Sequence, residues 1–239
     1  MVTGQNIPCC AFFWLTPETS RPRLFFVRRG FAVRDAKIVE MLSEWSAECS
    51  PHDPVLVVPW SDPSDSTGNR RFIDLRENPY DLDHLPEAEQ YPPLMHALRA
   101  LNGARSPVFT AKCDAWRLDP EELDALRLNL GINDDEGAEG FASYIDVLWR
   151  ERSRFASFHL QEQMLHRLTR QASSLEYHYA MLDCILRPAV IDFTGPQEGF
   201  AITLYVKAAG HDARAAEEHW ASTLEGVVAL FRGKDLGFT

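Results

Sequence analysis

The chain has 239 residues, of which 45% are hydrophobic and 25% charged, and its formal net charge is -11. This length can bury a self-sufficient core in one large domain or two small ones, and the apolar content excludes global disorder. So acidic a balance argues against a general nucleic-acid binder and against an anionic membrane surface, because both kinds of attachment need a basic surface.

The N-terminal residues combine short apolar runs with turn residues. Strands are predicted at 9–15 and 23–28, where apolar and aromatic residues concentrate. Asp35 is a candidate helix cap, and the residues after it recur at the spacing i, i+3, i+4, i+7, namely Ile38, Met41, Leu42 and Trp45. A helix over 35–47 is therefore predicted.

The next segment is apolar only in places. The uniformly apolar run 55–60 predicts a strand buried on both faces, and 72–75 is a candidate to pair with it. The rest of 61–93 is rich in Asp, Pro, Ser, Gly and Asn and is interpreted as a surface connection. A short helix is predicted over 93–102, with Gly103 closing it.

The middle of the chain holds an alternating strand and strong helix signals. A half-buried strand is predicted over 108–118, and Asp119-Pro120-Glu121-Glu122 predicts a capped helix that continues to Gly131. The longest helical region is predicted from Phe141 to about Tyr179, with interruptions near 152–154 or 173–174.

The clearest signal lies between Cys184 and Gly233. Two apolar runs, 185–193 and 200–207, flank the turn-rich 194–199 and predict a hairpin. Pro188 places its strand near an edge or at its start. An amphipathic helix capped by Asp212 follows, and we expect it to lie on the hairpin with Trp220 as its anchor.

These elements predict an α+β fold, an antiparallel sheet with helices on one face. The order β-α-β-β-α suggests a ferredoxin-like lobe over residues 105–239. The N-terminal half, 1–104, can be interpreted as a second similar lobe, and a single larger sheet is the alternative.

One face of the predicted sheet is the first candidate site. Its polar and aromatic residues lie opposite the most apolar positions of their strands, so helices on one side would leave them open. We expect this face to bind a ligand or partner, to mediate self-association, or to pack within the chain. Its members are Thr110, Lys112, Asp114, Trp116, Thr203, Tyr205 and Lys207.

The second candidate is a metal triplet. His159, Glu162 and His166 share one face of the predicted long helix, where imidazole and carboxylate donors at this spacing suit Zn or Fe. They lie roughly opposite the apolar stripe of that helix, which favours a solvated surface instead.

The motif search finds no nucleotide-binding, serine-hydrolase, zincin or zinc-ribbon signature, so no cofactor is expected. The five cysteines show no disulfide or metal spacing and favour reduced thiols, with Cys113 and Cys184 in the core and Cys9-Cys10 filling an apolar strand. No signal peptide or membrane span is found, which favours the cytoplasm.

The sequence thus favours a non-enzymatic binding or regulatory protein that acts through an acidic surface or the half-polar sheet face, with a protein partner or a second copy. The alternative is a small-ligand-binding protein or a metal-dependent enzyme that uses the sheet face or the His159, Glu162 and His166 triplet.

Overall fold

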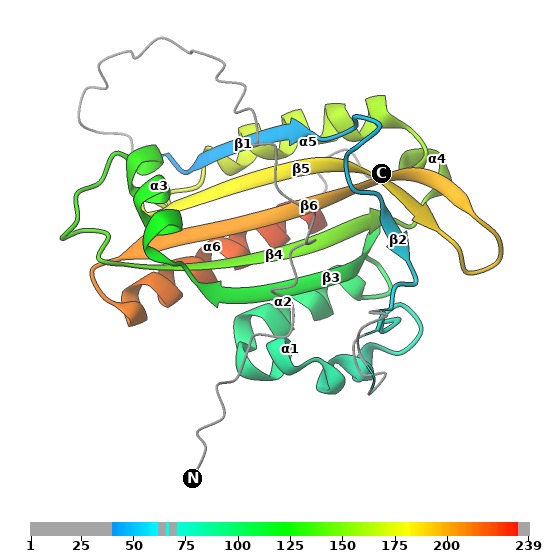
Figure 1. Cartoon of the computed structure of the whole chain (residues 1–239), viewed down its shortest axis with the longest axis horizontal. Coiled ribbons are helices and arrows are strands. Elements are labelled where there is room, and N and C mark those ends of the chain that lie inside the picture. The colour runs from blue at the N-terminus through cyan, green and yellow to red at the C-terminus, as the bar shows by residue number, and fades with distance from the viewer. Residues whose placement is uncertain (1–39, 62–65, 67–70, 234–239) are drawn as a thin grey trace.

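The computed structural model describes residues 40–61, 66 and 71–233, and the predicted α+β class is confirmed (Figure 1). The strands predicted at 9–15 and 23–28, and the Cys9-Cys10 pair, lie outside the described residues. In chain order the elements are β1 (Leu42–Ala47), β2 (Leu56–Val58), the 3-10 helix η1 (Pro79–His84), α1 (Pro86–Gln90), α2 (Pro92–Asn102), β3 (Val108–Arg117), α3 (Pro120–Leu130), β4 (Glu139–Trp149), α4 (Arg152–Phe155), α5 (Phe158–Ala172), β5 (Ala180–Ile191), β6 (Gln197–Gly210) and α6 (Ala213–Arg232).

The strands form one mixed sheet of six strands. Their order is β1-β5-β6-β4-β3, and β2 pairs with the C-terminal end of β5, beyond β1. The strands from β3 onward pair antiparallel, as expected, whereas β1 and β2 run parallel to β5. The N-terminal strands therefore extend the sheet of the C-terminal half, and one buried cluster takes side chains from both halves. The domain division at residue 104 and the ferredoxin-like assignment stay predictions.

The predicted hairpin is confirmed as β5 and β6, and Pro188 shows how the sheet tolerates it. β1 ends opposite Leu186, and β2 begins opposite Ala189. Pro188 lies between these two partners, at a local edge of β5 where the N–H that proline lacks has no strand to bond.

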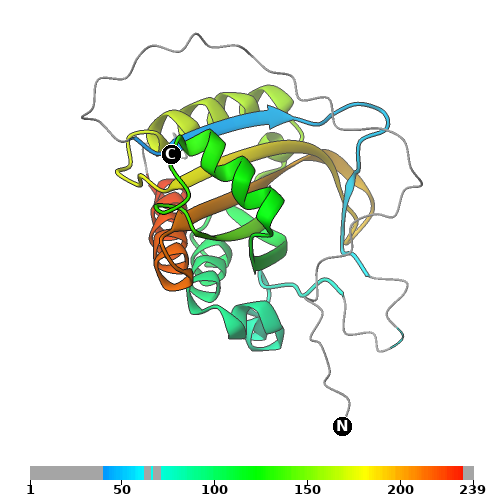
Figure 2. The same cartoon turned by 60° about the vertical axis from the view of Figure 1, so that its left-hand side comes forward.

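Three helices cover one face of the sheet. α6 packs on β6 and β4, and α2 and α5 flank it along the same side (Figure 2). Trp220 of α6 is fully buried, lies 4.6 Å from Phe141 between ring centroids, and donates from Nε1 to Ser143 Oγ at 2.8 Å. The predicted docking of this helix through Trp220 is confirmed.

α3 departs from the expectation that the helices share one face. Its Leu126 packs with Met181 and Ala209, which lie on the opposite side of β5 and β6 from α6. The predicted capping box is present, with the Asp119 side chain accepting from the Glu122 N–H at 2.8 Å.

Three predicted elements are wrong. Residues 42–47 are not helical but form strand β1, which pairs in parallel with Met181–Leu186 and so joins the sheet. Residues 72–75 form no strand, and their contact with the preceding run is one bridge between Ser61 and Arg71 and a Phe72 N–H bond to Trp60 O. Residues 139–149 form β4 rather than the start of a long helix, which survives only as α4 and α5.

Candidate functional site

One row of side chains crosses five strands on the face of the sheet that α6 leaves open. In the pairing register, Asp114 of β3 lies opposite Tyr144 of β4, which lies opposite Tyr205 of β6. The row continues to Asp183 of β5 and Glu44 of β1. Because side chains alternate between the two faces of a strand, the residues two positions before and after each member of this row lie on the same side of the sheet.

We name this side the polar sheet face. In Figure 1 it faces the viewer between α3 and β2. Its polar and aromatic residues are Glu44, Lys112, Asp114, Trp116, Tyr144, Asp146, Asp183, Arg187, Thr203, Tyr205 and Lys207.

Six of the seven sequence-predicted face residues are brought together here, and Thr110 is the exception. The register of β3 shifts between Thr110 and Cys113, so a bulge turns Thr110 toward the helix-covered side. There its Oγ1 accepts from Asn102 Nδ2 at 2.7 Å and its N–H donates to Asn102 Oδ1 at 3.0 Å. Past the bulge Lys112 is half-buried, with Nζ 5.0 Å from the Trp60 ring centroid.

Three aromatic rings form the centre of the face. Ring centroids are 6.3 Å apart for Trp116 and Tyr144 and 5.9 Å for Tyr144 and Tyr205, and all three side chains are half-buried. The Trp116 indole donates to Glu122 at 3.2 Å, and Lys207 Nζ lies 5.8 Å from the Tyr205 ring centroid. The helix cap of α3 thus fixes one end of an aromatic ladder across three strands.

Two buried carboxyls lie beside this ladder. Burial raises the pKa of Asp114 to about 6, the hydrogen bond from the Ala115 N–H opposes the rise, and Glu87 adds to it. Burial also raises the pKa of Asp146, although its carboxylate accepts from Thr203 Oγ1 at 2.6 Å. Both carboxyls lose their proton at a higher pH than a solvated aspartate does.

The β5 side of the face carries Asp183 and Arg187. Burial raises the pKa of Asp183, and Lys207 opposes that rise. Arg187 donates from Nε to Glu48 Oε2 at 2.9 Å. Burial acts to lower the pKa of Arg187, but Tyr205 and Glu48 raise it above its ordinary value. Arg187 therefore stays charged in the middle of the carboxyls.

Sequence reasoning missed Tyr144 and Asp146 because 141–149 was predicted to be helical. The available signal was alternation, since Ala142, Tyr144 and Asp146 occupy one side of β4, whereas Phe141, Ile145 and Val147 occupy the other together with Ser143. It was weak because both sides of this central strand are largely buried.

The predicted metal triplet does not converge. His159 Nδ1 lies 3.2 Å from Glu162, whereas His166 Nδ1 accepts from Trp45 Nε1 at 3.3 Å. Within residues 40–61, 66 and 71–233, no group of three His, Cys, Asp or Glu is arranged to hold a metal ion. Across the same residues, no helix is long and apolar enough to cross a bilayer.

The cysteines of the described part of the chain are free thiols. Cys113 and Cys184 are buried as predicted, whereas Cys49 is exposed. Burial raises the pKa of both buried thiols, which disfavours the reactive thiolate form.

Comparisons with protein-family models, with curated proteins and with solved structures find no match to this chain. The functional argument therefore rests on the residues of the site itself.

Proposed function

We propose that this is a non-enzymatic binding protein that engages a protein partner through the polar sheet face, and that the partner presents a basic segment. The observation that carries the proposal is the row formed by Asp114, Tyr144, Tyr205 and Asp183, in which aromatic rings lie between carboxyls on the sheet face opposite α6.

Charge supports a basic partner. The face and its margin carry five carboxyls, from Glu44, Glu48, Asp114, Asp146 and Asp183, against three cations, from Lys112, Arg187 and Lys207. The net charge of -11 would steer such a partner toward the protein from a distance. A second copy of this chain carries the same excess of acid and would be repelled, so a separate protein is favoured over self-association.

The aromatic ladder supports side-chain recognition. Tyrosine and tryptophan faces attract ammonium and guanidinium groups, and Lys207 near Tyr205 is such a contact within the chain. The rings stand on paired strands, so they lose little conformational freedom when a partner binds. Arginine or lysine side chains of the partner would stack on the rings and pair with Asp183 or Glu44.

Affinity capture from the host with matched variants tests the proposal. The wild-type protein is compared with Tyr205→Ser and Asp183→Asn, and with the control variants Leu160→Ser and Glu225→Gln, which alter exposed helix positions. We expect the wild type and the control variants to retain a basic protein that Tyr205→Ser and Asp183→Asn do not retain. Raising the salt concentration should elute that protein. Equal retention by the face variants would refute the proposal.

Sedimentation velocity of the isolated protein tests the remaining possibility, which is self-association through the polar sheet face. We expect a monomer whose sedimentation coefficient is unchanged by Tyr205→Ser. A dimer that this substitution dissociates would show that the face serves self-association instead.

A further inference from the structure

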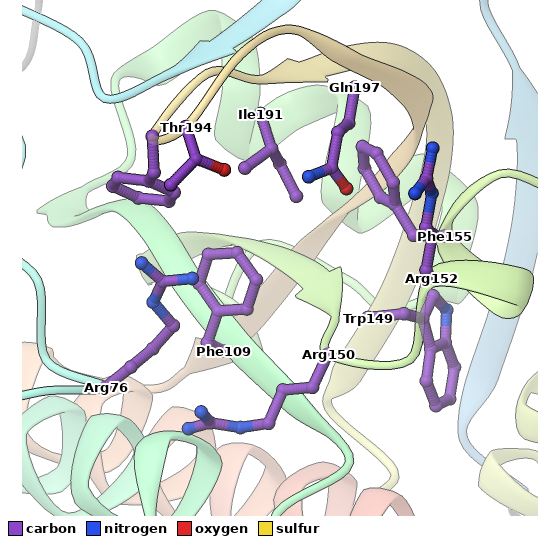
Figure 3. Close-up of a pocket in the computed structure, with 10 residues that line it drawn as sticks. Arg76, Phe109, Trp149, Arg150, Arg152, Phe155, Ile191, Thr194 and Gln197 are labelled. Atoms are coloured by element: carbon purple, nitrogen blue, oxygen red, sulfur yellow. The ribbon is translucent and has the colours of Figure 1, made fainter.

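A hollow lies where the β5–β6 hairpin passes over the ends of β3 and β4 (Figure 3). Its volume is about 380 Å³, within the size range of small-molecule sites. It shares no residue with the polar sheet face. The lining residues are Arg76, Phe109, Trp149, Arg150, Arg152, Phe155, Ile191, Phe193, Thr194 and Gln197.

The charge of this hollow is opposite to that of the whole chain. Three guanidinium groups line it, and no described residue contributes a carboxyl to the lining, although the chain carries 35 acidic residues against 24 Lys and Arg. Arg76 is compensated by Asp74, with Nε–Oδ1 and Nη2–Oδ2 distances of 2.8 and 2.6 Å. Arg150 and Arg152 form no ion pair with a described residue, which leaves positive charge at the hollow.

Two of the guanidinium groups are held in place by the protein. Arg76 lies over the rings of Phe109 and Phe193, at 4.6 and 4.0 Å from their centroids. Arg150 donates to Val108 O at 3.0 Å and to Asn102 O at 2.9 Å. Burial lowers the pKa of Arg150 and the nearby Arg76 lowers it further, so the cations repel each other. A bound anion would relieve that repulsion.

The apolar part of the hollow is equally well defined. Phe109, Trp149 and Phe155 are almost fully buried and form a rigid base for it, whereas Phe193 is 38% exposed. Gly199 of β6 brings the hairpin close to this surface, since a Cβ there would lie 2.5 Å from Phe155 O. Figure 3 shows Ile191, Thr194 and Gln197 of the hairpin facing Phe109, Arg76 and Arg150 across the hollow.

We propose that this hollow binds a small organic anion, with a carboxylate or phosphate group held by Arg76 and Arg150 and an apolar ring against the exposed side chain of Phe193. The planar, multiply donating guanidinium group suits both oxyanions. The ring would lie against Phe193, which is 38% exposed, so binding needs no rearrangement of the core. The site is independent of the partner surface proposed above.

Isothermal titration calorimetry of the full chain with phenyl phosphate tests this assignment, with inorganic phosphate, benzoate and benzyl alcohol as comparison probes. We expect phenyl phosphate or benzoate to bind more tightly than both inorganic phosphate and benzyl alcohol. Whichever of the two aromatic anions binds more tightly identifies the oxyanion that the site prefers. Absence of binding by either aromatic anion up to about 5 mM, a range in which a weak specific site is still detected, would overturn the proposal. So would equal binding of inorganic phosphate, because the apolar ring would then contribute nothing.

Matched variants locate the site. Arg150→Gln changes an exposed residue and is expected to weaken binding about tenfold or more, the usual loss for one charge-assisted hydrogen bond. Arg170→Gln removes the same charge from an exposed position on α5 and should leave the affinity unchanged. Arg76→Gln is expected to act like Arg150→Gln, with circular dichroism confirming the fold of both variants. Unchanged affinity in a folded Arg150→Gln variant would place the anion elsewhere and refute the site.

Discussion

Tyr144 of β4 and Tyr205 of β6 lie directly opposite each other in an antiparallel pair, with ring centroids 5.9 Å apart. This contact links the two strands at the centre of the polar sheet face. The pair therefore contributes to the stability of the sheet as well as to the proposed surface.

A double-mutant cycle measures that contribution. The coupling energy between Tyr144→Ala and Tyr205→Ala is expected to be about 0.5–1.5 kcal/mol, as for other aromatic pairs. Urea denaturation of the wild type, both single variants and the double variant gives the value. Additive effects of the two substitutions would show that the rings do not interact.

Asp114 makes the stability of the fold depend on pH. Its folded-state pKa of about 6 is raised above that of an unfolded aspartate, so the folded state binds the proton more tightly. Its contribution to stability is therefore full below about pH 4 and is lost as the pH rises through about 6. Asp114→Asn should remove this loss and raise the free energy of unfolding at pH 7 by about 1–3 kcal/mol.

Urea denaturation between about pH 4.5 and 7.5 checks this prediction, because that range brackets the titration. The difference in stability between the variant and the wild type should grow with pH. Glu225→Gln, which alters an exposed carboxyl of α6, serves as the control and should show no such growth. A difference that is constant with pH would mean that Asp114 titrates like a solvated aspartate.

Trp220 is expected to be the most sensitive position of α6. It is fully buried, contacts Phe141 and donates to Ser143, so Trp220→Ala should cost about 3–5 kcal/mol. The midpoint of thermal unfolding, measured beside Leu128→Ala, tests this because Leu128 is 83% exposed. An unchanged midpoint for the tryptophan variant would contradict the docking of α6.

Gly199 is expected to tolerate no side chain. A Cβ at this position would lie 2.5 Å from Phe155 O, so Gly199→Ala must displace α4 or the hairpin and should cost about 1–3 kcal/mol. Gly103→Ala is the control, since its nearest contact would be an ordinary 3.4 Å. Chemical denaturation compares the two, and equal stability would show that the hairpin and α4 separate easily.

Sequence patterns predicted the elements whose apolar residues follow one period. Trp220, Leu224 and Phe231 repeat along one helical face, and Ile202, Leu204 and Val206 alternate along one strand face. The face residues Lys112, Asp114, Trp116, Tyr205 and Lys207 followed from that alternation, and the structure brings them together.

The remaining features depend on contacts between distant segments. The alternation of β1 is hidden by Ser43, a polar residue on the helix-facing side whose Oγ donates to Thr169 O at 2.6 Å, so the sequence pattern there predicts a helix. The bulge that redirects Thr110 depends on Asn102 of the preceding helix. The arginine hollow draws its residues from segments as far apart as Arg76 and Gln197, and no local period relates them.

The most direct test of the partner surface is the dissociation constant of the captured partner for the wild type, for Tyr205→Ser and for the control Leu160→Ser. The account predicts at least about tenfold weaker binding by Tyr205→Ser, since a buried aromatic anchor usually contributes this much, and wild-type affinity for the control. Equal dissociation constants for all three proteins would contradict it.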